Sequence, residues 1–275
     1  MPTWDTATDW DNAQSSQYVV HESVADTDHV NDDWYYQGYN YTSPEIAASS
    51  LQGFYPLHED SGSVAHDVSN DNDLNTYNVV KGDGGILRGS SYYFDGTSSY
   101  CQSIGPVLPD VTFGGFALVA WVKTDVTSQV DRIAVNWSGD DADSWVSLEN
   151  VNGDFAIGFR SSTGSFYRPD TGTTIGDNSW HMIVATFDLS TEELNAYVDG
   201  TNVGTYSNTE ISDDWLFTSE SSYLTLGCNG DQAYFYDGNI SNVFVYDVDL
   251  ISSSADTLYN TVTGTGTYTT SKKSL

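Results

Sequence analysis

Two loops of this sequence carry side chains that could hold a ligand. The first runs from Asp67 to Asp73 and reads Asp-Val-Ser-Asn-Asp-Asn-Asp, which places carboxylate and amide oxygens close together. Calcium takes about six to eight oxygen ligands from such groups, so Asp67, Asn70 and Asn72 are candidate Ca²⁺ ligands. The loop is not an EF-hand, because Gly and Glu are missing from the sixth and twelfth positions counted from Asp71. A solvated acidic turn is the other interpretation of the same residues.

The second loop lies between two tryptophans. Trp137 and Trp145 enclose the sequence Ser-Gly-Asp-Asp-Ala-Asp-Ser, so that two indole rings flank Asp140, Asp141 and Asp143. Sugar rings stack on indoles and carboxylates accept hydrogen bonds from hydroxyls, which makes these five residues a candidate glycan-binding lip. The alternative is that both tryptophans are core residues at the ends of two strands joined by an acidic loop.

The sequence shows no catalytic constellation. Sandwich glycoside hydrolases need two carboxylates about 5 Å apart for retention, or wider apart for inversion, commonly on a Glu-x-Asp-x-x-Glu strand. That motif does not occur, and the adjacent Glu192 and Glu193 precede a strand in which their side chains would point to opposite faces. The five histidines show neither zinc spacing nor a nucleophile elbow, and His181 is interpreted as a strand residue. We therefore expect a protein that is not an enzyme.

The clearest structural signal lies between Asn178 and Gly200. Eight consecutive side chains alternate between two largely apolar faces, one with Trp180, Met182, Val184 and Thr186 and the other with His181, Ile183, Ala185 and Phe187. Such a strand is typical of a sheet that is buried on both sides. A second strand, residues 194–198, ends at Asp199-Gly200, which accept positive φ and allow the chain to reverse.

These two strands resemble the signature of laminin-G-like, concanavalin A-type lectin domains. Further segments are similar to the family's strands in the same order, namely residues 53–67, 92–100, 116–123, 224–227 and 236–246, with a short terminal helix at 252–259. The resemblance implies an all-β fold, an antiparallel jelly-roll β-sandwich. The composition agrees, because short apolar alternations separated by Gly, Asp and Asn, with 24 Gly and 6 Pro, are typical of such folds.

The resemblance also bears on the candidate metal site. In that family a metal near the first loop is often completed by acidic residues that precede the last strand. In this sequence Ser241 and Asn242 stand at that place, so Asn242 joins Asp67, Asn70 and Asn72 as a candidate ligand. The expected cofactor is Ca²⁺, because every one of these side chains offers a hard oxygen.

The net charge indicates the solvent in which the protein works. The chain has 39 Asp and Glu against 8 Lys and Arg, which gives a formal net charge of -31. Such a charge opposes compaction at ordinary ionic strength, whereas in molar salt the screening length falls to about 3 Å and the repulsion largely disappears. The 39% hydrophobic content, with 19 Tyr and 8 Trp, excludes a disordered acidic tail. We expect a folded protein of a salt-loving organism or its virus, without affinity for nucleic acid.

The composition divides the chain into three parts. Residues 1–45 contain no Lys or Arg and are rich in aromatic side chains that have no core of their own to fill. We expect an extended or short-helical arm that docks onto another subunit through Trp4, Trp10, Trp34, Tyr35 and Tyr36. A strand and loop folded back on the sandwich is the alternative. Residues 46–260 would form the sandwich, and residues 261–275, rich in Thr, Ser and Gly, an extended tail.

Export signals and cysteines bear on localisation. The first residues show neither a basic start nor an apolar run, which predicts no secretory signal, and no segment reaches the length of a membrane span. Glycan-binding sandwiches normally act outside cells, and a protein made in the host cytoplasm and released on virus particles reconciles these observations. Cys101 and Cys228 permit one disulfide, but two buried thiols are the favoured interpretation.

We therefore expect a virion structural protein of a halophilic archaeal virus, a turret, spike or tail fibre at the particle surface. Its partners would be further copies of itself, other virion proteins bound through the N-terminal arm, and glycans of the host surface. The alternative is a free-standing carbohydrate-binding module of a halophilic archaeon, which binding of glycan by an isolated monomer would favour.

Overall fold

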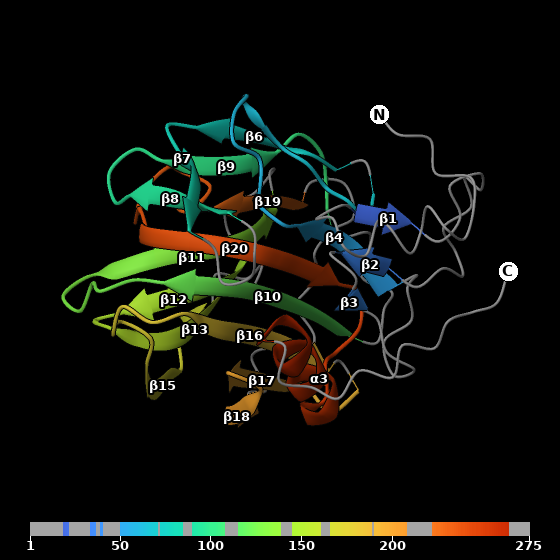
Figure 1. Cartoon of the computed structure of the whole chain (residues 1–275). Helices are drawn as coiled ribbons and strands as arrows, with labels where there is room; N and C mark the ends of the chain where they lie inside the picture. The colour runs from blue at the N-terminus through green and yellow to red at the C-terminus, as the bar shows by residue number, and fades with distance from the viewer. Residues whose placement is uncertain are drawn as a thin grey trace, which may run out of the picture.

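The computed structural model describes residues 19–21, 34–36, 39–40, 50–70, 72–84, 90–107, 115–138, 145–160, 166–188, 190–207 and 222–263. Across these residues two large sheets pack face to face, and a helix covers the outer face of one of them (Figure 1). Every strand pair in both sheets is antiparallel. The predicted antiparallel β-sandwich is therefore confirmed.

The first sheet has eight strands among the described residues. Its order is β18 (Thr201–Ser207), β17 (Glu193–Val198), β16 (His181–Asp188), β10 (Gly115–Lys123), β20 (Asp237–Tyr246), β8 (Ser90–Asp95) and β7 (Val80–Gly84), and β4 (Leu51–Tyr55) also pairs with β20. Strands far apart in the sequence thus lie side by side, as in β10 and β20, and the register pairs Leu118 with Val245.

The second sheet has nine strands in the same part of the chain. Its order is β14 (Phe166–Tyr167), β13 (Asp154–Arg160), β12 (Trp145–Val151), β11 (Val130–Ser138), β19 (Ser222–Leu226), β9 (Tyr100–Ser103), β6 (Leu74–Tyr77) and β5 (Val64–Ala65), and β15 (Asp170–Thr174) pairs with β13. The strands β11, β12 and β13 are neighbours and are the longest strands of this sheet (Figure 1).

The central strands of the eight-stranded sheet are buried on both faces. On its inner face Ile183, Ala185 and Phe187 join the cluster that fills the space between the sheets. On its outer face Met182 and Val184 join a second cluster. The two-sided alternation predicted for the strand at 180–187 is therefore confirmed, and burial of both faces explains why its residues are nearly all apolar.

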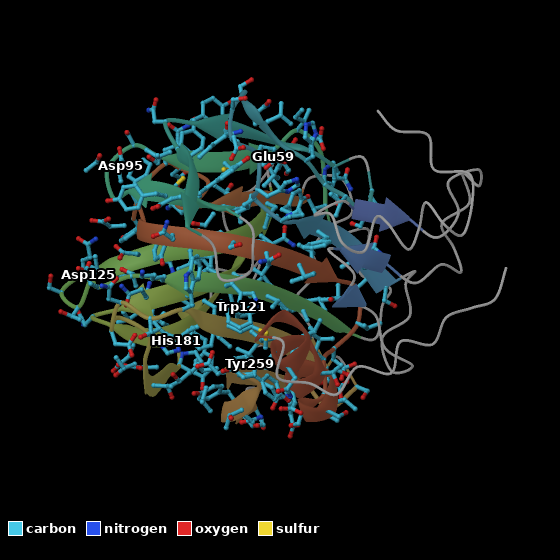
Figure 2. All side chains as sticks on the ribbon, in the orientation of Figure 1. Glu59, Asp95, Trp121, Asp125, His181 and Tyr259 are labelled. Carbon is cyan, nitrogen blue, oxygen red and sulfur yellow. The ribbon has the colours of Figure 1, made fainter. Side chains whose placement is uncertain are left out.

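Helix α3 (Ser252–Thr263) covers that outer face. Trp121 of β10 and Tyr259 of α3 stack with ring centroids 5.6 Å apart, and Figure 2 shows the two side chains next to each other. The predicted helix at 252–259 is present and continues for one further turn, so the first residues of the predicted 261–275 tail are helical.

The predicted reversal at Asp199-Gly200 joins β17 to β18. Both residues have positive φ, 52° and 78°, as a tight hairpin turn between right-twisted strands requires. The Asp199 side chain also accepts a hydrogen bond from the backbone N–H of Met182, so the turn is tied to β16 at 2.9 Å.

The described part of residues 1–45 forms strands. β1 (Val19–His21), β2 (Trp34–Tyr36) and β3 (Tyr39–Asn40) pair with one another in a small antiparallel sheet. These strands are extended segments, which is one of the two forms that we predicted for the arm, and pairing satisfies their backbone hydrogen-bonding groups. The arm as an assembly segment stays a prediction.

Two further sequence predictions concern the cysteines and membranes. Cys101 and Cys228 are free and buried, as the favoured interpretation has it, and burial raises the pKa of both thiols. Within the described ranges, no helix has the length and apolar character that crossing a membrane demands.

Candidate functional site

The outer face of the nine-stranded sheet carries polar and aromatic side chains, and no helix in the described part of the chain covers it. Along β12, Val146 and Leu148 point into the core between the sheets, so the alternate residues Trp145, Ser147 and Glu149 point outward. The register places Arg160 of β13 beside Trp145 on the same face.

A break in regular pairing places a charged residue from β11 on this face. The register between β11 and β12 shifts between Arg132 and Ala134, and both Ile133 and Ala134 enter the core. A bulge of this kind re-aims the side chains that flank it. Arg132 and Val135 consequently line the same outer pocket although they are three positions apart.

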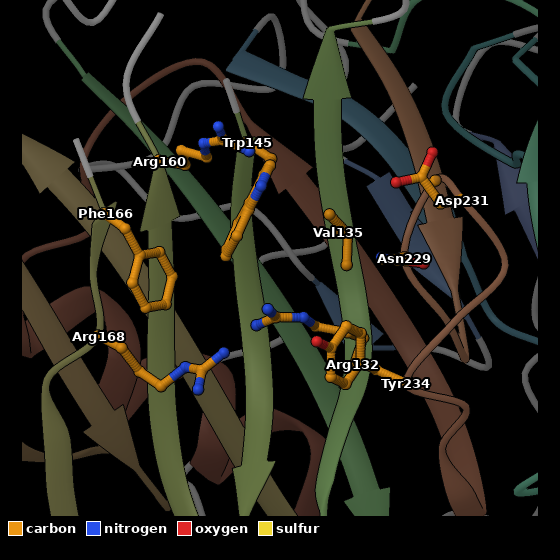
Figure 3. A pocket seen from close by; sticks show the side chains of 10 residues that line it. Arg132, Val135, Trp145, Arg160, Phe166, Arg168, Asn229, Asp231 and Tyr234 are labelled. Atoms are coloured by element: carbon orange, nitrogen blue, oxygen red, sulfur yellow. The ribbon is translucent and has the colours of Figure 1, made fainter. Parts of the chain in front are cut away.

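The pocket itself is open and has a volume of about 580 Å³. Its lining comes from β11, β12, β13, the segment around β14, and the connection between β19 and β20 (Figure 3). Three of the lining residues carry guanidinium groups and three carry aromatic rings. The full lining is Arg132, Val135, Trp145, Arg160, Phe166, Arg168, Asn229, Gly230, Asp231 and Tyr234.

A buried carboxylate organises two of the arginines. Glu149 is completely buried and forms ion pairs with Arg132 and with Arg168, the latter at 2.8 Å between Oε2 and Nε. Ser147 donates its hydroxyl to Glu149 Oε1 and accepts a hydrogen bond from Arg132 Nη1 at 3.2 Å. A buried charge is tolerated only when it is paired and hydrogen-bonded, so this network holds the guanidinium groups in place.

Both arginines remain charged at neutral pH. Burial, reinforced by the nearby charge of Arg168, lowers the pKa of the Arg132 guanidinium, and burial also lowers the pKa of Arg168. The ordinary pKa of about 12.5 is high enough that neither change removes the charge at pH 7. The side chain of Arg132 is 5% exposed and that of Arg168 is 26% exposed, so Arg168 is the more accessible to a ligand.

Aromatic rings pack around these guanidinium groups. Arg132 lies over the Trp145 ring at 4.4 Å and over the Tyr234 ring at 5.3 Å, and Arg168 lies over the Phe166 ring at 4.9 Å. The rings of Trp145 and Phe166 are 5.6 Å apart. Cation–π contacts of this kind orient the guanidinium planes, and all three rings belong to residues that line the pocket.

Backbone geometry shapes the pocket at Tyr234 and at Gly158. Tyr234 has a left-handed φ of 55°, held by a hydrogen bond of 2.9 Å from the Arg132 N–H to its carbonyl oxygen. Such a conformation costs free energy in a residue with a side chain and is found at ligand-binding sites. On the floor, a Cβ at Gly158 would collide with Glu149, Ser147 and Trp145, so only glycine leaves room for the network.

Of the five residues predicted for the glycan-binding lip, only Trp145 has a described side chain. Trp145 lines the pocket and is half-buried, so it is not a core residue. Trp137 pairs with Trp145 in the register, but its side chain lies outside the described residues, as do Asp140, Asp141 and Asp143.

Sequence reasoning missed the basic and aromatic residues of the pocket. Arg132, Arg160 and Arg168 are three of the four arginines in the sequence, all within 37 residues. That clustering in a chain so poor in positive charge was a signal that could have marked them, whereas Phe166 and Tyr234 gave none.

Two of the predicted Ca²⁺ ligands, Asp67 and Asn70, form hydrogen bonds within the protein. Asp67 Oδ1 accepts hydrogen bonds from the N–H of Phe54 and from Ser69, and Asn70 donates to the carbonyl oxygens of Leu51 and Gln52. These contacts brace the loop against β4. Burial raises the pKa of Asp67, although its hydrogen bonds act in the opposite direction.

The other two predicted ligands lie near β4 as well. The backbone carbonyl of Asn72 accepts the hydroxyl of Tyr55, and the N–H of Asn242 donates to Pro56. The side-chain oxygens Asp67 Oδ2 and Asn242 Oδ1 are buried without a hydrogen-bond partner, and a cation would satisfy such atoms. Among the residues that the structure describes, no cluster of three or more His, Cys, Asp or Glu side chains has a metal-binding arrangement.

His181 is a structural residue of β16. Its Nδ1 lies 2.8 Å from Asp199 Oδ2 and its Nε2 lies 3.1 Å from Asp177 Oδ1. The hydrogen bond with Asp199 raises the pKa of His181, against the opposing effect of burial. The imidazole thus ties the hairpin turn to the loop before β16.

The predicted assembly residues are described only in part. Trp34, Tyr35 and Tyr36 make up β2, the central strand of the small sheet, and their side chains lie outside the described residues, as do Trp4 and Trp10 entirely. Docking of these residues onto another subunit stays a prediction.

Comparison with known proteins gives a family and a fold. A family model described as the concanavalin A-like lectin/glucanases superfamily matches residues 95–254, which is more than half of the chain. Domain 4 of AbnA, a GH43 extracellular arabinanase from Geobacillus stearothermophilus, solved in complex with arabinotriose, is similar with a TM-score of 0.59 and 19% identity, over 76% of this chain and 98% of that domain. No curated protein sequence matches significantly.

Toxin binding domains show the same fold. The binding domain of Paraclostridial Mosquitocidal Protein 1 has a TM-score of 0.60 at 15% identity, over 78% of this chain and 52% of that one. The binding domain of botulinum neurotoxin DC in complex with SialylT has a TM-score of 0.58 at 12% identity, with the same coverage of 78% and 52%. This chain therefore spans about half of each toxin binding domain, and at these identities the likeness shows the fold alone.

Proposed function

Because the chain belongs to the concanavalin A-like lectin/glucanase superfamily, we propose that it is a non-enzymatic carbohydrate-binding domain whose ligand occupies the pocket on the nine-stranded sheet. One observation carries the proposal. The same pocket is lined by the aromatic residues Trp145, Phe166 and Tyr234 together with guanidinium donors. The apolar face of a sugar ring packs on aromatic side chains while its hydroxyls accept hydrogen bonds, so this combination suits a saccharide.

The carboxylates of the pocket argue for binding without hydrolysis. Glycoside hydrolysis uses two carboxyl groups that flank the scissile bond and exchange protons with the substrate. Glu149 is fully buried and both of its carboxylate oxygens are engaged by arginines, so it is not placed to contact a glycosidic bond. Asp231 is exposed and lies on the rim of the pocket. The other described lining residues include no second carboxylate that could act together with Asp231.

The neighbours in the same fold support this function by analogy. One is a domain solved with arabinotriose and another is a binding domain solved with SialylT. We carry over only the class of ligand, a saccharide, because the identities of 19% and 12% are too low to carry over any residue.

Titration with glycans tests the proposal. The full chain in molar KCl is applied to a glycan array, and the strongest ligand is then titrated by calorimetry against the wild type, Trp145→Ala and Tyr77→Ala. Tyr77 is an exposed aromatic residue of β6, in the same sheet but outside the pocket, so it is the matched control. We expect Trp145→Ala to weaken binding by about tenfold or more and Tyr77→Ala to leave it unchanged. Equal losses in both variants, or binding to no glycan, would reject the pocket as the ligand site.

We also propose a location for this domain, the surface of a halophilic virion, with residues 1–45 as the assembly segment. The net charge of -31 and the aromatic-rich, Lys- and Arg-free composition of residues 1–45 support it. A free-standing carbohydrate-binding module of a halophilic archaeon would use the same pocket. Light scattering in molar salt distinguishes the two, since the virion protein should form a closed oligomer that a variant starting at Ser49 does not form, whereas the free-standing module should be monomeric in both forms.

A further inference from the structure

The connection between β19 and β20 supplies one wall of the pocket. Asn229, Gly230, Asp231 and Tyr234 belong to it, whereas the other six lining residues come from the sheet or from the segment around β14. We propose that this connection is a preformed wall for the saccharide and that Asn229 is its positioning residue, which fixes the place of the Tyr234 ring. This inference rests on the carbohydrate-binding function proposed above and adds a residue to it.

Asn229 closes the connection on itself. Its side-chain Oδ1 accepts a hydrogen bond from the backbone N–H of Ala233 at 2.7 Å. Its own N–H donates to the carbonyl oxygen of Ala233 at 3.0 Å, and its carbonyl oxygen accepts the N–H of Gln232, also at 3.0 Å. An asparagine side chain that bonds to nearby backbone stabilises a turn in this way. Three hydrogen bonds of one residue therefore hold residues 229–233 as a closed turn, and Tyr234 follows directly after it.

The backbone around this turn adopts a conformation that is costly for residues with side chains. Gln232 and Tyr234 both have a φ of 55°, in the left-handed region. Glycine takes that region without steric cost, whereas other residues keep it only where the surrounding structure over-determines it. At position 234 the chain has tyrosine in place of glycine, which indicates that the ring itself is used.

Arg132 connects Tyr234 to the sheet. The N–H of Arg132 donates to the carbonyl oxygen of Tyr234 at 2.9 Å, and the guanidinium of Arg132 lies over the Tyr234 ring at 5.3 Å. The same guanidinium lies over the Trp145 ring at 4.4 Å, and Figure 3 shows these side chains together in the pocket. A displaced Tyr234 would therefore also disturb the arrangement of Arg132 and Trp145.

A wall that is already in place lowers the cost of binding. Ordering a loop when the ligand arrives subtracts from the affinity, and a preorganised site avoids that loss. The Tyr234 residue is 53% exposed, so core packing does not fix its position, and the closed turn together with Arg132 must do so. Weakening the turn at Asn229 should therefore lower the affinity for a saccharide although the three aromatic residues of the pocket remain.

A double-mutant cycle tests whether Asn229 acts through Tyr234. The full chain in molar KCl is titrated by calorimetry with the strongest ligand from the glycan array, as wild type, Asn229→Ala, Tyr234→Ala and the double variant. We expect each single variant to weaken binding by about tenfold and the double variant to bind no more weakly than Tyr234→Ala, because a ring that is absent cannot be misplaced. Losses that multiply in the double variant would show that Asn229 acts independently of Tyr234 and would overturn the proposal.

Asn229→Asp separates the turn from a direct contact with the ligand. Aspartate keeps an oxygen that accepts the Ala233 N–H and lacks the amide N–H donors, so this variant should bind within about twofold of wild type. A loss as large as that of Asn229→Ala would assign Asn229 to direct contact and contradict a positioning role. The matched control is Asn202→Ala, which removes a similar bond to the N–H of Gly204 on β18, in the other sheet, and should leave the affinity unchanged.

Hydrogen exchange reads the order of the turn without a ligand. The amides of Gln232 and Ala233 should exchange faster in Asn229→Ala than in the wild type, and Asn229→Asp should restore their protection. The thermal midpoint should change little in either variant, because Asn229 lies outside the core clusters. Unchanged exchange in Asn229→Ala would show that the turn does not depend on this side chain.

The outcomes separate this proposal from the function on which it rests. If Trp145→Ala weakens binding and Asn229→Ala does not, the carbohydrate-binding function stands and the positioning role of Asn229 is wrong. If no glycan binds, or if neither Trp145→Ala nor Tyr234→Ala changes the affinity, both proposals are wrong.

Discussion

The two sheets of this sandwich differ in what lies on their outer faces. The eight-stranded sheet is covered by α3, and Trp121, Met182 and Val184 fill a second apolar cluster beneath it. Among the described residues no helix covers the nine-stranded sheet over β11–β13, and its outer face carries the arginines, the buried Glu149 and the aromatic pocket. The comparison shows two uses of the same strand geometry. One sheet packs against other elements on both faces, whereas the other packs only on its inner face, and its outer face carries the pocket.

Removing the largest side chain of the covered face should have the largest effect. Trp121 is fully buried and stacks on Tyr259, so Trp121→Ala should lower the free energy of unfolding by about 3–5 kcal/mol. Trp145→Ala, on the open face, should lower it by much less because Trp145 is only half-buried. Denaturant unfolding of both variants in molar KCl measures the difference, and equal losses would contradict the contrast between the two faces.

Neutralising the buried carboxylate tests whether the open face also stabilises the fold. Glu149→Gln removes the shared partner of Arg132 and Arg168 and leaves two desolvated cations, which should cost about 3 kcal/mol. Asp231→Asn, an exposed carboxylate of the same pocket, is the control and should change stability by less than about 0.5 kcal/mol. Chemical denaturation compares them, and a stable Glu149→Gln variant would show that the arginines do not depend on Glu149.

The histidine on the covered sheet predicts a pH dependence. The pKa of His181 is raised from the ordinary 6.5, chiefly by its hydrogen bond with Asp199. A histidine with a raised pKa in the folded state contributes stability that is fully present below pH 6.5 and is lost as the pH rises through the folded value. We therefore expect the thermal midpoint to fall as the pH rises above about 6.5 and through the raised pKa of His181. His181→Gln should flatten that part of the profile, and an unchanged slope in the variant would assign the effect to other groups.

Calcium should have the smallest effect. Asp67 Oδ2 and Asn242 Oδ1 are buried oxygens without a hydrogen-bond partner, and a bound Ca²⁺ would satisfy them. A ligand that binds only the folded state stabilises it, so millimolar Ca²⁺ should raise the thermal midpoint by a few degrees, about 1 kcal/mol, relative to EDTA. Asp67→Asn should remove that response, and Asp73→Asn serves as a control on the same loop. An equal response in wild type and Asp67→Asn would exclude this site.

Local pattern predicted the elements of the fold well. The two-period alternation of residues 180–187, the Asp199-Gly200 reversal and the helix at 252–259 are features of a few neighbouring residues, and the structure has all three. The candidate site was predicted only through Trp145. Trp145 was recognised because an indole beside acidic residues is typical of glycan-binding sites. The arginines of the pocket lie on separate segments of the chain, and no sequence motif links them.

The sequence by itself therefore determined the class of fold and the net charge of the protein, because side-chain period and turn residues are local properties and charge is additive. The tertiary structure decided the site. Arg132 faces the pocket because the β11–β12 register shifts beside it, and Arg160 meets Trp145 because of the β12–β13 register. Tyr234 arrives from a connection about a hundred residues further along the chain, held to Arg132 by a backbone hydrogen bond. Strand order and register arise from packing across the whole sandwich, and no short segment of sequence contains that information.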